Sequence, residues 1–284
     1  MSQLKGGLVI LKDMVNSLPP SEKKIAQYIL ENPEESILLT ALMLGEKSKT
    51  SSAAVIRLCK SLGFSGFQEL KIRVAGDLQK QVVTEYRDIE PNEGFKNIID
   101  KVTTNTIQTL KETADIMDEK DLQRAVKALD NAPSIIFFGV GASYIAAKDA
   151  EQKFLRINKN AYSFSDAHMA ATSIANKGAD DVVVGISFSG NTDEVARLLK
   201  LAKHKNSTTI SITKYGNSLV SNFSDIQLHT SAAKEATIRS GATSSRIAQL
   251  QVIDILFMCL ASVQYDETVR HLDETREAIS FLKK

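Results

Sequence analysis

The stretch that most constrains this chain is an apolar run that ends in a turn rich in hydroxyl groups. Residues 182–186 read Val-Val-Val-Gly-Ile, a composition typical of a strand buried on both faces of a parallel sheet. Ser187, Ser189 and Thr192 follow at once, and apolar residues then recur at helical spacing, which predicts a helix over 192–205. The order of strand, turn and helix predicts an α/β domain with a polar turn at the carboxyl end of a buried strand.

A turn in this position suits a phosphate group. The start of a helix presents unpaired backbone N–H groups and a partial positive charge. Gly190 lets the backbone approach a ligand closely, and the hydroxyls of Ser187, Ser189 and Thr192 are donors for phosphoryl oxygens. An ordinary capped helix is the alternative, because Ser and Thr are also the usual capping residues.

A second turn of the same kind lies upstream. Residues 135–138 form another short apolar run, which leads into Gly139, Gly141 and Ser143. Two glycines at this spacing begin a dinucleotide-binding pattern, but Tyr144 stands where the third glycine is needed, so a nicotinamide or flavin cofactor is not expected. We interpret Ser143 as another hydroxyl at the carboxyl edge of an open α/β sheet, where such sheets bind ligands.

These two turns resemble the sugar isomerase (SIS) domain, and the resemblance covers roughly residues 125–265. It implies a five-stranded parallel sheet flanked by helices that binds phosphosugars. It also implies that the phosphate contacts are Ser143, Ser187, Ser189 and Thr192. The resemblance continues through residues that are candidates for reading the sugar: His168, Glu235, Arg239 and Ser240.

Composition sets limits on the class of protein. A chain of 284 residues with 43% hydrophobic residues suits two domains with real cores. The net charge of +1 gives no global field that favours nucleic acid or membranes. Residues 1–80 nevertheless hold 11 Lys and Arg against 8 Asp and Glu, whereas the remainder holds 24 against 26. The amino-terminal part is therefore the more basic one.

Neither a metal site nor a membrane anchor is expected. The two cysteines, Cys59 and Cys259, lie in apolar helical patterns, and the four histidines are scattered. We find no signal peptide and no long apolar span, which predicts a soluble cytoplasmic protein without a cofactor and without a membrane partner.

The first 80 residues read as a series of short helices. Pro19-Pro20 is expected to end the first helix, and Ser21 is expected to cap the second. Helices are then expected at about 40–47 and 52–62, joined by a turn at 49–51. Two short helices joined by a tight turn are the helix-turn-helix arrangement.

The helix expected at 52–62 has two distinct faces. At 100° per residue its apolar residues fall on one side, and Ala53, Arg57 and Lys60 fall on the opposite side. The apolar set is Val55, Leu58, Cys59 and Leu62. A face of small and basic residues suits a helix that lies in a DNA major groove, although a solvated face with two basic residues is a common alternative.

Residues 20–33 and 55–71 resemble the amino-terminal domain of RpiR/MurR-type bacterial regulators. In that family a helix-turn-helix domain precedes an SIS domain. The resemblance implies a transcription factor whose affinity for a double-stranded DNA operator responds to a sugar phosphate, with N-acetylmuramic acid 6-phosphate or another amino sugar phosphate as the expected effector. The candidate DNA contacts are Lys49, Ser51, Ser52, Ala53, Arg57 and Lys60.

Three positions depart from the family pattern. Lys49 stands in the turn where the family has Gly, and a left-handed conformation costs Lys more than Gly. Ala54 replaces a Thr, which removes a hydroxyl from the start of the helix. Gly45 stands where Ala is preferred. These changes concern individual contacts more than the fold.

The expected architecture is an all-α helix-turn-helix bundle at 1–78, linker helices at 79–124 and an α/β SIS domain with a carboxyl-terminal helix at 125–284. We expect a homodimer or tetramer that is not an enzyme. The main alternative is a phosphosugar isomerase or lyase, with Glu235 as the base and His168 opening the sugar ring. A third reading is a sensor that acts through protein partners without DNA. The complete helix-turn-helix pattern favours the regulator.

Overall fold

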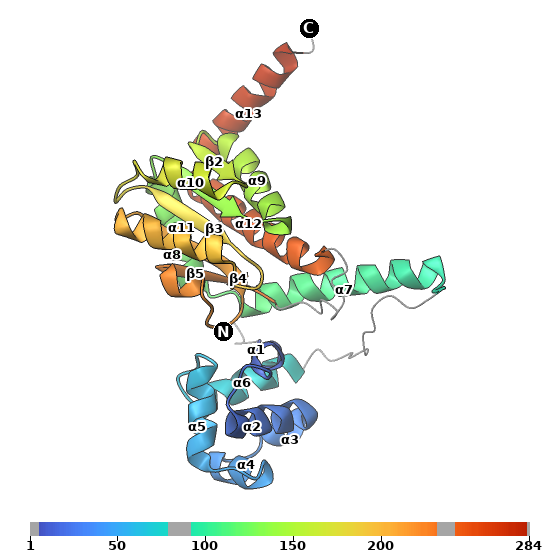
Figure 1. Ribbon diagram of the computed structural model, residues 1–284. Coiled ribbons are helices and arrows are strands. Elements are labelled where there is room, and N and C mark those ends of the chain that lie inside the picture. The colour runs from blue at the N-terminus through green and yellow to red at the C-terminus, as the bar shows by residue number, and fades with distance from the viewer. Residues whose placement is uncertain (1–5, 79–91, 232–241, 283–284) are drawn as a thin grey trace. The chain divides into compact units, whose positions relative to one another are not determined.

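In the computed structural model the chain forms two units, which divide between Ile116 and Met117 (Figure 1). The structure describes residues 6–78, 92–231 and 242–282. The amino-terminal unit is helical throughout these described residues. Its helices are α1 (Gly7–Met14), α2 (Pro20–Glu31), α3 (Pro33–Ser36), α4 (Ala41–Lys47), α5 (Ser52–Ser61), α6 (Phe67–Leu78) and α7 (Phe95–Ile116).

The helices of the first unit pack through the apolar faces that their sequences predict. Residues from five of these helices are almost completely buried: Ile10, Leu11, Ile25, Ile29, Leu44, Leu58 and Leu70. One predicted boundary is wrong. The second helix begins at Pro20 with Pro19 as its N-cap, so Ser21 lies inside the first turn and does not cap it. Proline suits this position because its fixed φ is helical and its missing N–H has no partner there.

The second unit is a parallel α/β sheet covered by helices. Its strands are β1 (Ile135–Gly139), β2 (Ala161–Phe164), β3 (Val182–Ile186), β4 (Thr208–Lys214) and β5 (Ile226–Thr230). Its α-helices are α8 (Glu119–Asn131), α9 (Ala142–Leu155), α10 (Ala167–Ile174), α11 (Asp193–His204), α12 (Thr243–Val263) and α13 (Tyr265–Phe281). The sheet order is β2-β1-β3-β4-β5, and all neighbouring strands are parallel. The predicted five-stranded parallel sheet is confirmed.

Each face of this sheet has its own core, because successive side chains of a strand point to opposite faces. Ile135 and Phe137 of β1 pack with α8, α9 and α12, whereas Ile136 and Phe138 pack with α10 and α11 (Figure 1). Phe137 also makes an edge contact with Phe154, with the ring centroids 5.3 Å apart. Burial on both faces explains why β1 and β3 are continuous apolar runs.

The sheet order creates a switch point between β1 and β3. The chain leaves β1 through α9 toward β2, and it later leaves β3 through α11 toward β4 on the other side. Since α9 and α11 cover opposite faces, the loops that follow β1 and β3 lead away to opposite sides of the sheet, the arrangement at which open α/β sheets bind ligands. Both hydroxyl-rich turns of the sequence lie in these loops.

Helix α12 of the second unit differs from the sequence expectation. Although no long apolar span was expected, α12 has 21 residues and is long and apolar enough to cross a membrane by length and composition. Its residues Val252, Ile253 and Leu256 lie in the core beside α8 and α9, as in the core helix of a globular domain.

The region expected as linker contains α7 and the beginning of α8, and α8 packs into the core of the second unit.

Candidate functional site

The two hydroxyl-rich loops begin side by side at the carboxyl edge of the sheet. Gly139, the last residue of β1, is paired in register with Ile186, the last residue of β3. Ser143 follows four residues after the first of these positions, and Ser187 follows directly after the second. The structure therefore brings the two predicted turns to one place, at the switch point where open α/β sheets bind ligands.

The loop at 187–192 is closed by its own hydroxyl groups. The hydroxyl oxygens of Ser187 and Thr192 lie 2.8 Å apart and share a hydrogen bond, and Ser187 is only 2% exposed. The backbone N–H of Asn191 donates to the Ser189 hydroxyl at 3.2 Å. Gly190 has a φ of +71°, in the left-handed region that favours glycine.

The alternative interpretation of this turn, an ordinary helix capped by a Ser or Thr side chain, does not apply to α11. Thr192 is the N-cap residue, but its hydroxyl bonds to Ser187 and makes no capping bond to the helix. By contrast, Asp166 caps α10 by accepting a hydrogen bond from the N–H of Met169 at 2.8 Å. Because no side chain caps it, the start of α11 leaves its first N–H groups to a ligand or to water.

The loop at 187–192 is also fixed from outside by the segment that follows β4. The N–H of Lys214 donates to the carbonyl of Phe188 at 3.0 Å, and the N–H of Val220 donates to the carbonyl of Gly190 at 2.9 Å. A Cβ atom on Gly190 would lie 2.4 Å from both Cβ and Oγ of Ser218. This close approach and the positive φ together exclude a side chain at Gly190.

Ser143 lies in the first turn of α9 and is nearly buried. Its hydroxyl accepts a hydrogen bond from Nε2 of Gln249 at 3.0 Å, and Gln249 is 1% exposed on α12. Sequence reasoning missed Gln249. The signal that was present is a polar residue on the face of α12 that otherwise carries Val252, Ile253 and Leu256.

The charge at the start of α11 is negative. Asp193 and Glu194 stand in its first turn, and both are exposed. Asp193 is partly neutralised by Arg197, whose Nη2 lies 3.7 Å from its carboxylate. Recognition of a phosphate at this turn therefore depends on directed hydrogen-bond donors more than on net charge.

The predicted sugar-reading residues are only partly within the described residues. His168 is the second residue of α10, and its side chain is exposed. It follows the carboxyl end of β2, next to β1 in the sheet, so it lies on the same edge as the two loops. Glu235, Arg239 and Ser240 lie outside the described residues.

In the first unit, α4 and α5 form a helix-turn-helix, as the sequence predicts. The N–H of Thr50 donates to the carbonyl of Gly45 at 2.7 Å, which closes the turn. Lys49 has a φ of +53°, the left-handed conformation that its place in the turn requires. A Cβ on Gly45 would lie 2.8 Å from the carbonyl carbon of Ser51, so the close approach of α4 to the start of α5 needs glycine.

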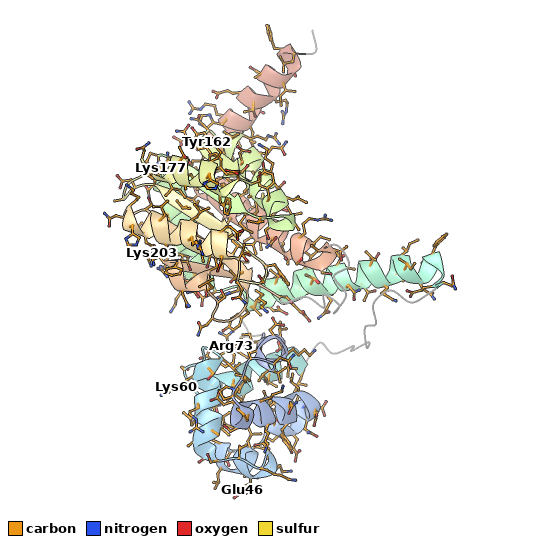
Figure 2. The ribbon with its side chains drawn as sticks, in the orientation of Figure 1. Glu46, Lys60, Arg73, Tyr162, Lys177 and Lys203 are labelled. Carbon is orange, nitrogen blue, oxygen red and sulfur yellow. The ribbon has the colours of Figure 1, made fainter. Side chains whose placement is uncertain are left out.

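The two predicted faces of α5 are confirmed. Val55, Leu58, Cys59 and Leu62 are buried. The opposite side carries Ala53, Arg57 and Lys60, all exposed, and Figure 2 shows Lys60 on the outer side of the helix.

The start of α5 is capped from within its own turn. The Ser51 side chain is the N-cap and accepts a hydrogen bond from the N–H of Ala54 at 3.2 Å. Ser52, the first residue of α5, is half-buried, whereas Lys49 in the turn is exposed. The side of α5 that the sequence assigns to DNA is thus exposed to solvent.

Arg57 has a neighbour that the sequence did not reveal. Its Nε lies 4.0 Å from Oε1 of Glu22, a residue of α2. The Glu22 side chain is 6% exposed and that of Arg57 is 57% exposed. The other carboxylate oxygen of Glu22 is buried without a hydrogen-bond partner among the residues that the structure describes. Arg57 is thus an exposed cation held close to a buried carboxylate.

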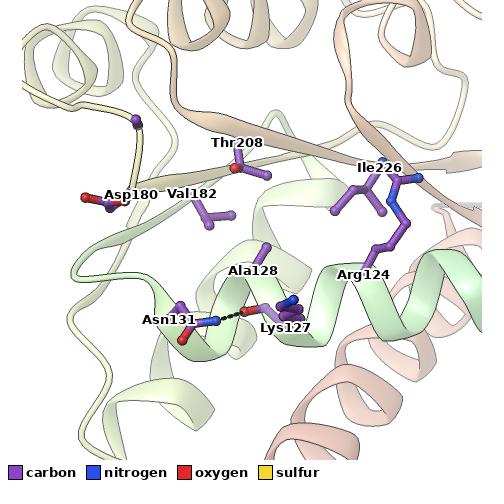
Figure 3. A pocket seen from close by; sticks show the side chains of 9 residues that line it. Arg124, Lys127, Ala128, Asn131, Asp180, Val182, Thr208 and Ile226 are labelled. Carbon is purple, nitrogen blue, oxygen red and sulfur yellow. Dashed lines mark hydrogen bonds between the residues drawn. The ribbon is translucent and has the colours of Figure 1, made fainter.

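A pocket of 340 Å³ lies at the opposite, amino edge of the sheet (Figure 3). It lies between α8 and the first residues of β3, β4 and β5, and Arg124, Lys127 and Asn131 line it from α8. The guanidinium of Arg124 already has two hydrogen-bond partners, because it donates to the carboxylate of Asp121 at 2.6 Å and to the carbonyl of Asp225 at 2.8 Å. Sequence reasoning did not predict this pocket.

Within the described ranges, no group of three or more His, Cys, Asp or Glu residues is placed to hold a metal ion.

Comparison with known proteins agrees with this arrangement. The family model of the rpiR-family helix-turn-helix domain matches residues 5–81, and the SIS domain model matches residues 128–259. The HTH-type transcriptional regulator YbbH of Bacillus subtilis is 50% identical over 278 residues, which cover 98% of each chain. An HTH-type transcriptional regulator of Caldanaerobacter subterraneus is 42% identical over 97% of this chain and 98% of its own.

A solved structure also matches both units. The NanR protein of Vibrio vulnificus, complexed with ManNAc-6P, is 29% identical and has a TM-score of 0.62. The match covers 97% of this chain and 99% of NanR. On these grounds the chain belongs to the RpiR family of helix-turn-helix transcriptional regulators, with an SIS domain as its second unit.

Proposed function

We propose that this protein is a transcriptional regulator that binds an operator through α4 and α5, and that a sugar phosphate bound at the switch point modulates the binding. The observation that carries the proposal is the presence of two features in one chain. One is the exposed face of small and basic residues on α5, and the other is the pair of hydroxyl-rich loops that follow β1 and β3. A phosphosugar isomerase does not require an exposed basic face on a helix-turn-helix. A DNA-binding protein without an effector does not require hydroxyl-rich loops at the switch point of a sheet.

The phosphate group is held by Ser143, Ser187, Ser189 and Thr192. A phosphate offers acceptors only. Ser143 and Ser189 each have a hydroxyl hydrogen to give, and of Ser187 and Thr192, which share one hydrogen bond, one hydroxyl keeps its hydrogen for the phosphate. The uncapped start of α11 adds backbone N–H groups and the positive end of the helix dipole. The whole group then lies at the carboxyl edge, within reach of side chains from the neighbouring strands.

The sugar ring is read by His168, Glu235, Arg239 and Ser240, of which the last two come from a neighbouring subunit. The effector class is an amino sugar phosphate, because NanR, which covers the same two units, was solved with ManNAc-6P. N-acetylmuramic acid 6-phosphate belongs to the same class. N-acetylglucosamine phosphate is a further member of this class, and ribose and glucose phosphates are the comparison compounds.

The operator is contacted by the exposed side of α5 and by the turn before it. Arg57 reads guanine or holds a phosphate, and Lys49 and Lys60 hold phosphates. Ser51 and Ser52 add hydroxyls at the start of the helix, and Ala53 allows its close approach to the groove. A homodimer or tetramer places two such helices about one DNA turn apart.

The effector acts by preferring one arrangement of the subunits. A ligand that binds both arrangements equally shifts no equilibrium, however tightly it binds. The linker at 79–124, which contains α7, joins the DNA-binding domain at 1–78 to the effector domain at 125–284 and transmits the difference. We place this regulator in the cytoplasm, where its operator and its effector meet.

We propose further that the chain does not turn over its sugar phosphate. The relatives are named as transcriptional regulators, and the helix-turn-helix unit is complete. The alternative, a phosphosugar isomerase or lyase, requires a base near the sugar, and Glu235 is the candidate. Robust turnover of any phosphosugar that is abolished by Glu235→Gln establishes the alternative.

The test is fluorescence anisotropy on DNA from upstream of the gene for this protein, at fixed salt. A panel of sugar phosphates is titrated into the complex: N-acetylmannosamine 6-phosphate, N-acetylmuramic acid 6-phosphate, N-acetylglucosamine 6-phosphate, glucose 6-phosphate and ribose 5-phosphate. We expect saturable binding that one compound shifts. Absence of specific binding with every compound contradicts the proposal.

A further inference from the structure

Gln249 joins two helices at the phosphate site through a single side-chain hydrogen bond. Its Nε2 donates to Oγ of Ser143 at 3.0 Å, across 106 residues of sequence. Both side chains are shielded from solvent, with Gln249 1% and Ser143 9% exposed. The bond therefore lies in a medium where water does not compete for either group.

The direction of this hydrogen bond decides what Ser143 can do. A serine hydroxyl has one hydrogen and two lone pairs. The amide N–H of Gln249 occupies one lone pair, so the hydroxyl hydrogen of Ser143 points elsewhere. The oxygens of a phosphate accept hydrogen bonds and do not offer them at neutral pH, so a hydroxyl at a phosphate site is useful only as a donor.

We propose that Gln249 is a positioning residue that fixes the Ser143 hydroxyl as a donor toward the phosphate group. The proposal rests on the proposed function, because it needs a phosphate at the switch point between β1 and β3. Ser187 and Thr192 have no such arrangement, since their hydroxyls bond to one another and either oxygen can be the donor. Ser143 differs from these two residues because the buried amide of Gln249 sets the direction in which its hydroxyl donates.

The surroundings of Gln249 show that its amide serves this contact. Its neighbours on the buried side of α12 are Ser245 and Ala248 toward the start of the helix, and Val252 and Ile253, which belong to an apolar core, beyond it. An apolar residue of similar size fits such a face, whereas a buried amide costs free energy unless it is hydrogen-bonded. The contact also ties α12 to α9, two helices that pack together along the same face of the sheet.

The experiment is a double-mutant cycle measured by isothermal titration calorimetry on the full chain. The probe is the compound of the sugar phosphate panel that binds the wild-type protein most tightly. The variants are Gln249→Leu, Gln249→Glu and Ser143→Ala, singly and in combination. Ser262→Glu is the matched control, because it places the same charge at an exposed position of α12, roughly 20 Å along the helix from Gln249. Thermal unfolding of each variant checks that the fold persists.

We expect Gln249→Leu to weaken binding roughly 5-fold to 10-fold, because the Ser143 hydroxyl is no longer directed at the phosphate. Gln249→Glu weakens it more, roughly 50-fold, because a carboxylate accepts the hydroxyl hydrogen and also repels the phosphate. The difference in sugar phosphate affinity between the wild-type protein and Gln249→Glu becomes smaller as the pH falls, because a protonated carboxyl group can again donate a hydrogen bond to Ser143. In the Ser143→Ala background, Gln249→Leu has no further effect.

Two results overturn this inference. One is a loss of affinity on Gln249→Leu that is equally large with and without the Ser143 hydroxyl, which indicates a general structural role. The other is unchanged affinity in Gln249→Leu and Gln249→Glu. Failure of the wild-type protein to bind any compound of the panel is a different result, because it contradicts the proposed function itself.

Discussion

Nε of Arg57 lies 4.0 Å from Oε1 of Glu22, and this pair joins the exposed basic side of α5 to the interior of the first unit. Glu22 is buried on α2 and its second carboxylate oxygen has no hydrogen-bond partner within the described residues. A buried carboxylate is costly unless a cation lies close to it. Arg57 lies close enough to compensate Glu22, and under the proposed function it also presents its guanidinium to DNA.

Arg57→Ala is expected to lower both DNA affinity and stability. Loss of a base or phosphate contact weakens operator binding by about 1–3 kcal/mol. Loss of the compensating cation costs about 1–2 kcal/mol of unfolding free energy, less than for a fully buried pair because Arg57 is half exposed. Operator binding is measured by anisotropy and stability by urea unfolding.

The double variant Arg57→Ala with Glu22→Gln separates these two roles. A neutral amide no longer needs a cation, so we expect the stability to recover while the DNA affinity stays low. If the double variant is no more stable than Arg57→Ala alone, the electrostatic account of Glu22 is wrong.

Gly45→Ala is expected to destabilise the helix-turn-helix. The added Cβ meets backbone atoms of Ser51 and Ser52 at 2.8 Å and 2.9 Å, and backbone atoms cannot move aside as a side chain can. We expect a loss of about 1–3 kcal/mol in unfolding free energy. Gly66→Ala is the control, since its Cβ meets nothing within 4 Å, and it is expected to leave the unfolding free energy almost unchanged.

Gly190→Ala is expected to remove the effector response. Its positive φ and the contact at 2.4 Å with Ser218 force the loop at 187–192 to rearrange. We expect sugar phosphate binding to be lost in calorimetry while operator binding persists. Gly178→Ala, where the added Cβ meets nothing within 4 Å, serves as the control. Normal effector binding by Gly190→Ala means that the loop does not hold the phosphate.

Cys59 is expected to be unreactive while the protein is folded. Burial raises the pKa of its thiol from 9.0 to about 11. A raised pKa in the folded state favours the neutral thiol, so this group stabilises the fold below pH 9 and loses that contribution as the pH rises toward 11. Alkylation with iodoacetamide at pH 8, followed by mass spectrometry, is expected to spare Cys59 until urea unfolds the chain.

Much of the fold follows from local pattern. The strands at 135–139 and 182–186 are buried on both faces and are therefore continuous apolar runs that sequence identifies easily. The division of α5 into two faces follows from the helical period alone. Lys49 is a clear case, because its place in a tight turn predicts the positive φ that the structure shows.

The parts that sequence did not predict depend on contacts between distant residues. Gln249 and Ser143 are 106 residues apart, and only the packing of α12 on α9 brings them together. Glu22 looked like an ordinary acidic residue in the first turn of a helix, because its burial depends on how α2 packs against α5. The cap expected at Ser21 failed because two prolines precede it and the second one starts the helix.

The measurement that tests the account most directly combines Ser187→Ala with Ser189→Ala and follows operator binding by anisotropy. These residues belong to the loop at 187–192, whereas most of the residues proposed to contact DNA lie on α5. The account predicts that the double variant binds the operator with wild-type affinity and no longer responds to the sugar phosphate that shifts the wild-type protein. An unchanged response, or the loss of operator binding together with the response, contradicts it.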